Sequence, residues 1–212
     1  MDAETLAARA YLYRVFQYLM GNEPTEAMLA GIDGDLVREA CEIMGAEAPE
    51  ALLQDAAEAI ENAEALEALR SQHMKALVGP AKLASPPWES AQLSGDGALF
   101  SRVTLDVRNA YRTQGLLPQE YPRVADDHVA LECAFLAELA SRAQRAAEAG
   151  DTEAERELLA ASSAFLDQHL GQWVTGFAAS MDAEKTPFYA RAAQVLASLV
   201  HQDVLLLEDA LG

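Results

Sequence analysis

The feature that most constrains this chain is the recurrence of apolar residues at helical spacing within segments made of strong helix formers. In residues 3–20, Leu6, Ala10, Tyr13 and Phe16 recur every three or four positions, as on one face of an amphipathic helix. Alanine, leucine and glutamate are abundant, whereas valine, isoleucine and threonine, which favour strands, are sparse. The sequence therefore predicts an all-α fold.

The length and composition predict one packed helical unit. The chain has 212 residues, of which 51% are hydrophobic, enough for one sizeable core and a single domain spanning residues 1–212. Residues 79–98 hold three prolines and three glycines, which predicts a long irregular loop within a helical bundle. The expected helices cover residues 3–20, 25–31, 35–45, 49–77, 99–114, 126–148, 152–170 and 187–210.

The net charge narrows the class of partner. Fifteen basic residues against thirty-four acidic residues give a formal charge of −19. A potential this negative repels nucleic acids and anionic membrane surfaces and speeds encounter with cationic partners, although acidic surfaces also serve solubility alone. The first residues are acidic where a signal peptide would be positive, and no apolar run reaches the length of a membrane span. We therefore expect a cytoplasmic protein without stable membrane insertion.

The sequence contains none of the common catalytic or metal-binding motifs. There is no H-E-x-x-H, no Glu three positions before any histidine, no phosphate-binding P-loop, no G-x-G-x-x-G and no G-x-S-x-G. Cys41 and Cys133 lie far apart in helical segments, so buried free thiols are favoured over a disulfide or a metal site. We expect no enzyme activity, no catalytic residues, no metal and no cofactor.

Two short signatures are the candidates for function. The segment Ser85–Ser90, with the sequence SPPWES, places Trp88 and Glu89 after two prolines in a loop, where Trp88 either contacts a ligand or pins the loop to the core. Asp126, Asp127 and His128 open a helix, with Glu132 one turn further on. Together, in so acidic a protein, they predict a surface that receives a cationic, partly apolar peptide.

The second signature also has a purely structural explanation. Asp126 or Ala125 can occupy the N-cap position of the helix, where a carboxylate accepts hydrogen bonds from free backbone N–H groups. The functional alternative is a polar cluster exposed at a groove, in which Asp127, His128 and Glu132 accept hydrogen bonds from guanidinium groups. Trp173 and the remaining histidines, at positions 73, 169 and 201, are expected to pack structurally or lie at the surface.

A longer series of short motifs is similar to a known family. Leu69-Arg70, Leu77-Val78-Gly79-Pro80, the Trp88 segment and Asp126-Asp127-His128 follow one another in the order seen in the TorD/DmsD family of redox-enzyme maturation chaperones. Two later pieces agree, His169-Leu170 with Trp173 and Pro187-Phe188-Tyr189. The resemblance spans roughly residues 66–191.

This resemblance implies an all-helical, cytoplasmic, non-enzymatic chaperone. Such a protein binds the twin-arginine signal peptide, or the apo-form, of a molybdenum-cofactor oxidoreductase and holds it until the cofactor is inserted. The implied peptide-binding residues are Asp127, His128 and the Trp88 segment. Two alternatives remain: a chaperone for a molybdoenzyme subunit that is not exported, and a nucleotide-dependent enzyme that uses Asp127 and His128. The loops at 79–98 and 115–125 are compatible with a monomer or a domain-swapped dimer.

Overall fold

The described residues fold as helices joined by short connections. The computed structural model describes residues 1–79, 82–94, 102–118 and 125–212, and no strand occurs among them, which confirms the all-α prediction. The helices are α1 (Ala3–Gly21), α2 (Glu26–Ala30), α3 (Gly34–Met44), α4 (Glu50–Glu61), α5 (Ala63–His73), the π-helical turn η1 (Met74–Val78), α6 (Glu89–Ser94), α7 (Arg102–Thr113), α8 (Val129–Glu148), α9 (Thr152–Gln168), α10 (Leu170–Ser180) and α11 (Pro187–Leu211).

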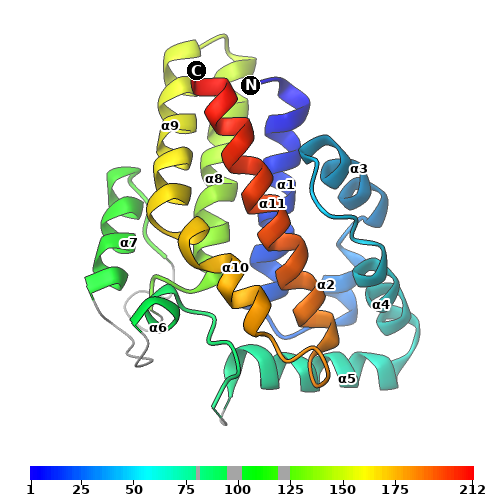
Figure 1. Ribbon diagram of the computed structural model, residues 1–212. Coiled ribbons are helices and arrows are strands. Elements are labelled where there is room, and N and C mark those ends of the chain that lie inside the picture. The colour runs from blue at the N-terminus through cyan, green and yellow to red at the C-terminus, as the bar shows by residue number, and fades with distance from the viewer. Residues whose placement is uncertain (80–81, 95–101, 119–124) are drawn as a thin grey trace.

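Four long helices, α1, α8, α9 and α11, run side by side and form the body of the molecule (Figure 1). Helix α1 packs on α8, α8 packs on α9, and α11 contacts α1, α9 and α10. Helices α3 and α4 flank one side of this body, α6 and α7 lie on the other, and α5 crosses one end (Figure 1). The two chain termini lie together at the opposite end. The end crossed by α5 is the one where the site described below is built.

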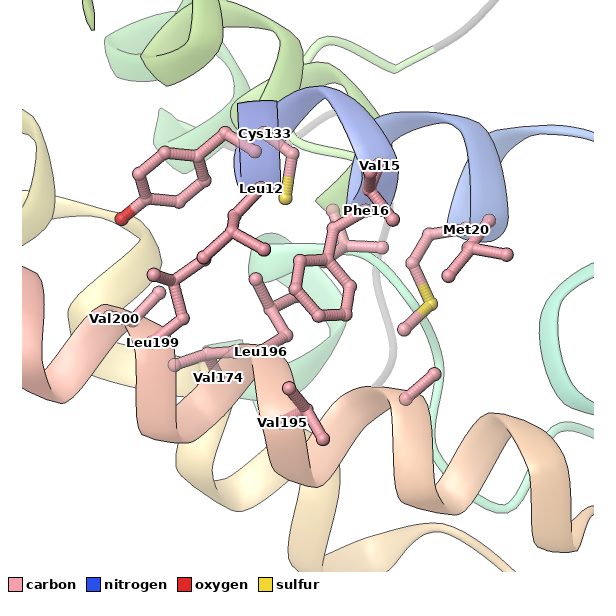
Figure 2. Packing of buried hydrophobic residues seen from close by; sticks show 14 of the residues in the cluster. Leu12, Val15, Phe16, Met20, Cys133, Val174, Val195, Leu196, Leu199 and Val200 are labelled. Atoms are coloured by element: carbon pink, nitrogen blue, oxygen red, sulfur yellow. The ribbon is translucent and has the colours of Figure 1, made fainter. Parts of the chain in front are cut away.

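The core lies where the apolar faces of these helices meet (Figure 2). Leu12 and Phe16 of α1 lie opposite Leu196 and Leu199 of α11, and all four side chains are almost completely buried. Cys133 of α8 closes one side of this group. Because residues from both ends of the chain share this core, the first and last helices are held by the same packing.

A buried polar network also joins the first and last helices. The Arg9 guanidinium of α1 and the Asp203 carboxylate of α11 form a two-point ion pair, with Nη2 to Oδ2 at 3.0 Å. The Tyr13 hydroxyl donates to the same carboxylate at 2.9 Å. All three side chains are fully buried. Both cysteines are buried and free, as the sequence predicts.

The predicted long helix over residues 49–77 is wrong in one respect, because the structure divides it. Helix α4 ends at Glu61, and Asn62 then adopts an extended conformation. The Asn62 side chain accepts hydrogen bonds from the N–H groups of Glu64 and Ala65 and thereby caps the next helix, α5. A side chain that competes with the backbone for hydrogen bonds is the physical reason for the break.

The irregular loop predicted over 79–98 is only partly correct. Residues 80–81 and 95–98 lie outside the described residues, and Glu89–Ser94 form the short helix α6. The Trp88 carbonyl accepts hydrogen bonds from Ala91 and Gln92 and so begins this helix. Trp88 and Glu89 therefore lie at a helix start, which fixes the directions of their side chains.

The predicted helix over 152–170 is followed by another helix that the sequence analysis did not separate. Helix α9 ends at Gln168, His169 caps both helices, and α10 begins at once with Leu170. At the junction, a Cβ added to Gly171 would lie 2.4 Å from the backbone oxygen of Leu166, so only glycine fits there. This sharp change of direction carries Trp173, which is buried within α10, towards the site.

Candidate functional site

An isolated backbone bridge brings the two sequence signatures together. The Glu89 N–H donates to the Asp127 carbonyl at 2.9 Å, and the Val129 N–H donates to the Pro87 carbonyl at 2.9 Å. Pro87 has no N–H and a fixed φ, so it suits the extended segment that presents this carbonyl. Trp88 and His128, forty residues apart in the chain, consequently lie side by side.

The side chains of Trp88 and His128 form the accessible part of the site. Their rings meet edge to face with centroids 5.3 Å apart, and both are partly exposed. Edge-to-face contacts of this kind stabilise aromatic pairs beyond the area that they bury. The pair presents partly exposed aromatic surface beside the start of α6 and of α8.

His128, rather than Asp126 or Ala125, is the N-cap of α8. Its Nδ1 atom accepts a hydrogen bond from the Ala130 N–H at 3.1 Å, which requires an unprotonated Nδ1. Burial lowers the pKa of His128 to about 4, although the neighbouring Asp127 acts in the opposite direction. The imidazole is therefore neutral near pH 7. The predicted start of the helix at residue 126 is corrected to Val129.

The two aspartates before His128 are fully buried and have structural partners. The Asp126 carboxylate accepts a hydrogen bond from Arg108 Nε at 2.7 Å. Asp127 Oδ2 accepts a hydrogen bond from the Ser90 N–H at 2.8 Å, so this side chain caps α6 rather than its own helix. Of the two alternatives, the exposed polar cluster is therefore wrong for Asp127, and Asp126 is held by an ion pair instead of capping α8.

Two glutamates are buried beneath the same surface. Glu89 and Glu132 are 1% and 0% exposed, so these predicted site residues are not solvent-exposed either. His169 Nδ1 lies 3.2 Å from the Glu89 carboxylate oxygens, and Trp173 Nε1 donates to Glu132 Oε2 at 3.1 Å. Burial, and then the charge of Glu89, raise the pKa of Glu132 well above its ordinary value and favour its protonated form.

The buried polar groups of the site retain unused hydrogen-bonding capacity. Five buried atoms here have no hydrogen-bond partner among the described residues, although most buried polar atoms in proteins are paired. One is an N–H donor, one is a hydroxyl oxygen and three are carboxyl oxygens, so the cluster can both donate and accept hydrogen bonds. The atoms are Trp88 Nε1, Ser90 Oγ, Asp126 Oδ1, Asp127 Oδ1 and Glu132 Oε1.

The helical segments before and after Trp88 in the chain carry exposed apolar side chains. Met74 and Val78 of η1 are 42% and 54% exposed, and Leu93 of α6 is 49% exposed. The π-helical turn η1 directly follows the buried His73 at the end of α5. The site thus combines an aromatic pair with buried carboxyl groups, and η1 and α6 add exposed apolar side chains to the protein surface.

The site is not organised as a metal centre. Within the described ranges, no group of three histidine, cysteine, aspartate or glutamate side chains could hold a metal ion. In the same ranges, no helix is long and apolar enough to cross a membrane. The roles of Arg108 and His169 cannot be predicted from the sequence, because each acquires its partner only through the tertiary fold.

A comparison with protein families decides the family. The model of the nitrate reductase delta subunit family matches residues 44–179, which is more than half of the chain and includes every residue of the site. The chain belongs to the nitrate reductase delta subunit family. This is a TorD-like family of redox-enzyme maturation chaperones, whose members serve molybdoenzymes and are not catalysts.

The family assignment confirms the coarser part of what the resemblance implied and excludes the nucleotide-dependent enzyme. Closer membership in the TorD/DmsD group stays a prediction. No curated protein matches the chain significantly. The roles of individual residues in the nitrate reductase delta subunit family therefore have to be argued from the geometry of this site.

Proposed function

We propose that this member of the nitrate reductase delta subunit family is a cytoplasmic chaperone that binds the twin-arginine signal peptide of a molybdenum-cofactor oxidoreductase. It holds the precursor until the cofactor is inserted and then permits export. The observation that carries the proposal is the bridge that places Trp88 beside His128 above four buried carboxyl groups, those of Glu89, Asp126, Asp127 and Glu132.

The chemistry of a twin-arginine peptide matches this surface. Two guanidinium groups are followed by an apolar segment, and guanidinium pairs with carboxylates through planar, two-point hydrogen bonds. Arg108, which pairs with Asp126, shows that this cluster accommodates a guanidinium group. The buried Asp127 carboxylate beneath the two rings contributes negative charge under this surface, and the chain's net charge of −19 favours encounter with a cationic peptide.

The apolar part of the peptide accounts for most of the expected affinity. Trp88, together with the exposed Met74 and Val78 of η1 and Leu93 of α6, offers apolar surface on the segments before and after the site in the chain. Burying three or four apolar side chains contributes about 1.5–3 kcal/mol each before ordering costs, whereas micromolar binding needs roughly −8 kcal/mol net. Guanidinium contacts then set the register of the peptide and the rate of encounter.

Calorimetry with the signal peptide of the oxidoreductase encoded beside this gene tests the proposal. His128→Asn keeps a side chain that caps the helix but removes the imidazole, and Trp88→Leu removes the aromatic surface. We expect each to weaken binding about tenfold, as for residues at the centre of an interface. His201→Asn, an exposed histidine on α11, and Leu205→Ala, an exposed leucine on that helix, serve as matched controls.

The peptide itself is varied in the same experiment. Replacing Arg-Arg by Lys-Lys should weaken binding, because lysine lacks the planar fork. If the peptide does not bind at all, or if the control variants weaken binding as much as the site variants, the proposal fails. If the lysine peptide binds as well as the arginine peptide, and the site variants still matter, the client is a non-exported subunit without twin arginines.

A further inference from the structure

The basic residues of one pocket stand out against the acidic chain. The sequence contains only three lysines, Lys75, Lys82 and Lys185, and all three line the same cavity of about 360 Å³. They come from η1, from the segment after Gly79 and from the connection between α10 and α11. We call this cavity the lysine pocket.

The lysine pocket is positively charged in a strongly negative protein. Asp182, which pairs with Lys185 at 2.9 Å, is the acidic residue among the lining residues, so they carry a net charge of +2. Neither Lys75 nor Lys82 has an ion pair with a described residue. Thr186, the N-cap of α11, also lines the pocket, and the positive end of a long helix dipole lies there.

The remaining lining is largely apolar. Met74, Ala76, Ala84 and Met181 form much of the wall between the lysines. Methionine side chains adapt to irregular apolar partners, and pockets of this size with a few placed polar groups are typical of binding sites. The lining therefore suits an acidic side chain flanked by apolar ones.

A peptide segment with apolar side chains fits the pocket better than a free small anion, because the apolar wall adds contacts that charge alone does not supply. The net charge of −19 repels small anions at long range, so the pocket works against the field of the whole protein. A segment already held at a neighbouring site reaches the pocket at a high effective concentration. Ser85 lines the pocket and is three residues from Trp88, a distance of at most roughly 11 Å along the chain.

We infer that the lysine pocket docks an acidic, partly apolar peptide segment. The inference rests on the proposed function only in taking that segment to belong to the same client. The client would then present a basic stretch to the Trp88–His128 surface and an acidic stretch to the lysine pocket. Opposite charges at adjacent sites fix which way the polypeptide lies across the end of the bundle.

Fluorescence anisotropy with a labelled peptide of alternating aspartate and leucine tests the inference. Wild-type protein is compared with Lys75→Gln/Lys82→Gln and with the matched control Arg102→Gln/Arg145→Gln, which changes the net charge equally at exposed positions elsewhere. The lysine variant should bind about five- to tenfold more weakly, while the control binds as wild type does. Added salt should weaken wild-type binding more than binding by the lysine variant.

Peptide variants and a competitor separate the outcomes. A version with asparagine in place of aspartate should bind weakly, and inorganic phosphate should not displace the acidic peptide at millimolar concentration. Absence of binding, equal binding by both double variants, or displacement by phosphate overturns the inference. Binding of the twin-arginine peptide is measured on the same samples, so a failure there removes the proposed function without affecting the result at the lysine pocket.

Discussion

Replacing Glu132 by glutamine should make the protein more stable at neutral pH and leave its stability nearly unchanged in acid. Glu132 is fully buried, and burial together with the charge of Glu89 raises its pKa well above the ordinary value of 4.5. Asp127 acts in the same direction, whereas the hydrogen bond from Trp173 opposes the shift. Glutamine has nearly the same shape, keeps an oxygen for Trp173 and carries no proton that can be lost.

The sign of the pH dependence follows from proton binding in the two states. The folded protein retains a proton on Glu132 at pH values where the unfolded chain has released it. Wild-type stability therefore falls as the pH rises from about 4.5 through the raised pKa. The loss is on the order of 1 kcal/mol per pH unit, so the gap between variant and wild type widens by roughly 2–3 kcal/mol over two pH units. Typical domains are stable by only about 5–15 kcal/mol.

Urea unfolding of both proteins between pH 5 and pH 8 measures this gap. Glu148→Gln, an exposed glutamate on the same helix α8, is the matched control and should show no widening gap. A constant difference between Glu132→Gln and wild type at every pH would show that folded Glu132 has already released its proton by pH 5, and would contradict the raised pKa. A variant that is less stable than wild type by more at pH 8 than at pH 5 would refute the reasoning outright.

Two further substitutions test the packing that supports the site. In thermal melts, Gly171→Ala should lower the free energy of unfolding by about 1–3 kcal/mol, because its Cβ would lie 2.4 Å from the Leu166 backbone oxygen. The control Gly176→Ala, in the same helix, has open space around its Cβ and should be neutral or stabilising. In urea unfolding, Arg9→Met should lower the free energy of unfolding by about 3–5 kcal/mol, because it leaves Asp203 charged and buried without a partner. The double variant Arg9→Met/Asp203→Leu should recover much of this stability. Equal losses in the single and double variants would contradict the prediction.

Local signals in the sequence account for most of the helices. The amphipathic pattern at the start of the chain becomes α1, Gly45 and Gly115 end their helices with positive φ values of 64° and 69°, and Thr186-Pro187 opens α11. The break at Asn62 was not predicted, because asparagine is found both inside helices and at helix caps. Which of the two positions it takes depends on how the neighbouring residues pack in the fold.

The candidate site was only partly predictable. Spacing along the chain brought Asp126, Asp127, His128 and Glu132 together, and the recurring motif order added Trp88. Their burial and partners could not be read from the sequence, because these depend on segments that meet only in the folded chain. The isolated backbone bridge between the Trp88 and His128 segments brings the two rings together, while the carboxyl groups beside them are buried and the rings stay partly exposed.

The sequence by itself determined the helical fold class, the strongly negative charge, the free buried thiols and the two signatures, because composition, periodicity and short-range capping are local properties. The tertiary structure alone decided which carboxylates are buried, that His128 caps α8, and that three lysines distant in the chain share one pocket. The desolvation of a side chain and its interactions with distant charges depend on which segments pack against it, and the packing of the whole core determines those contacts.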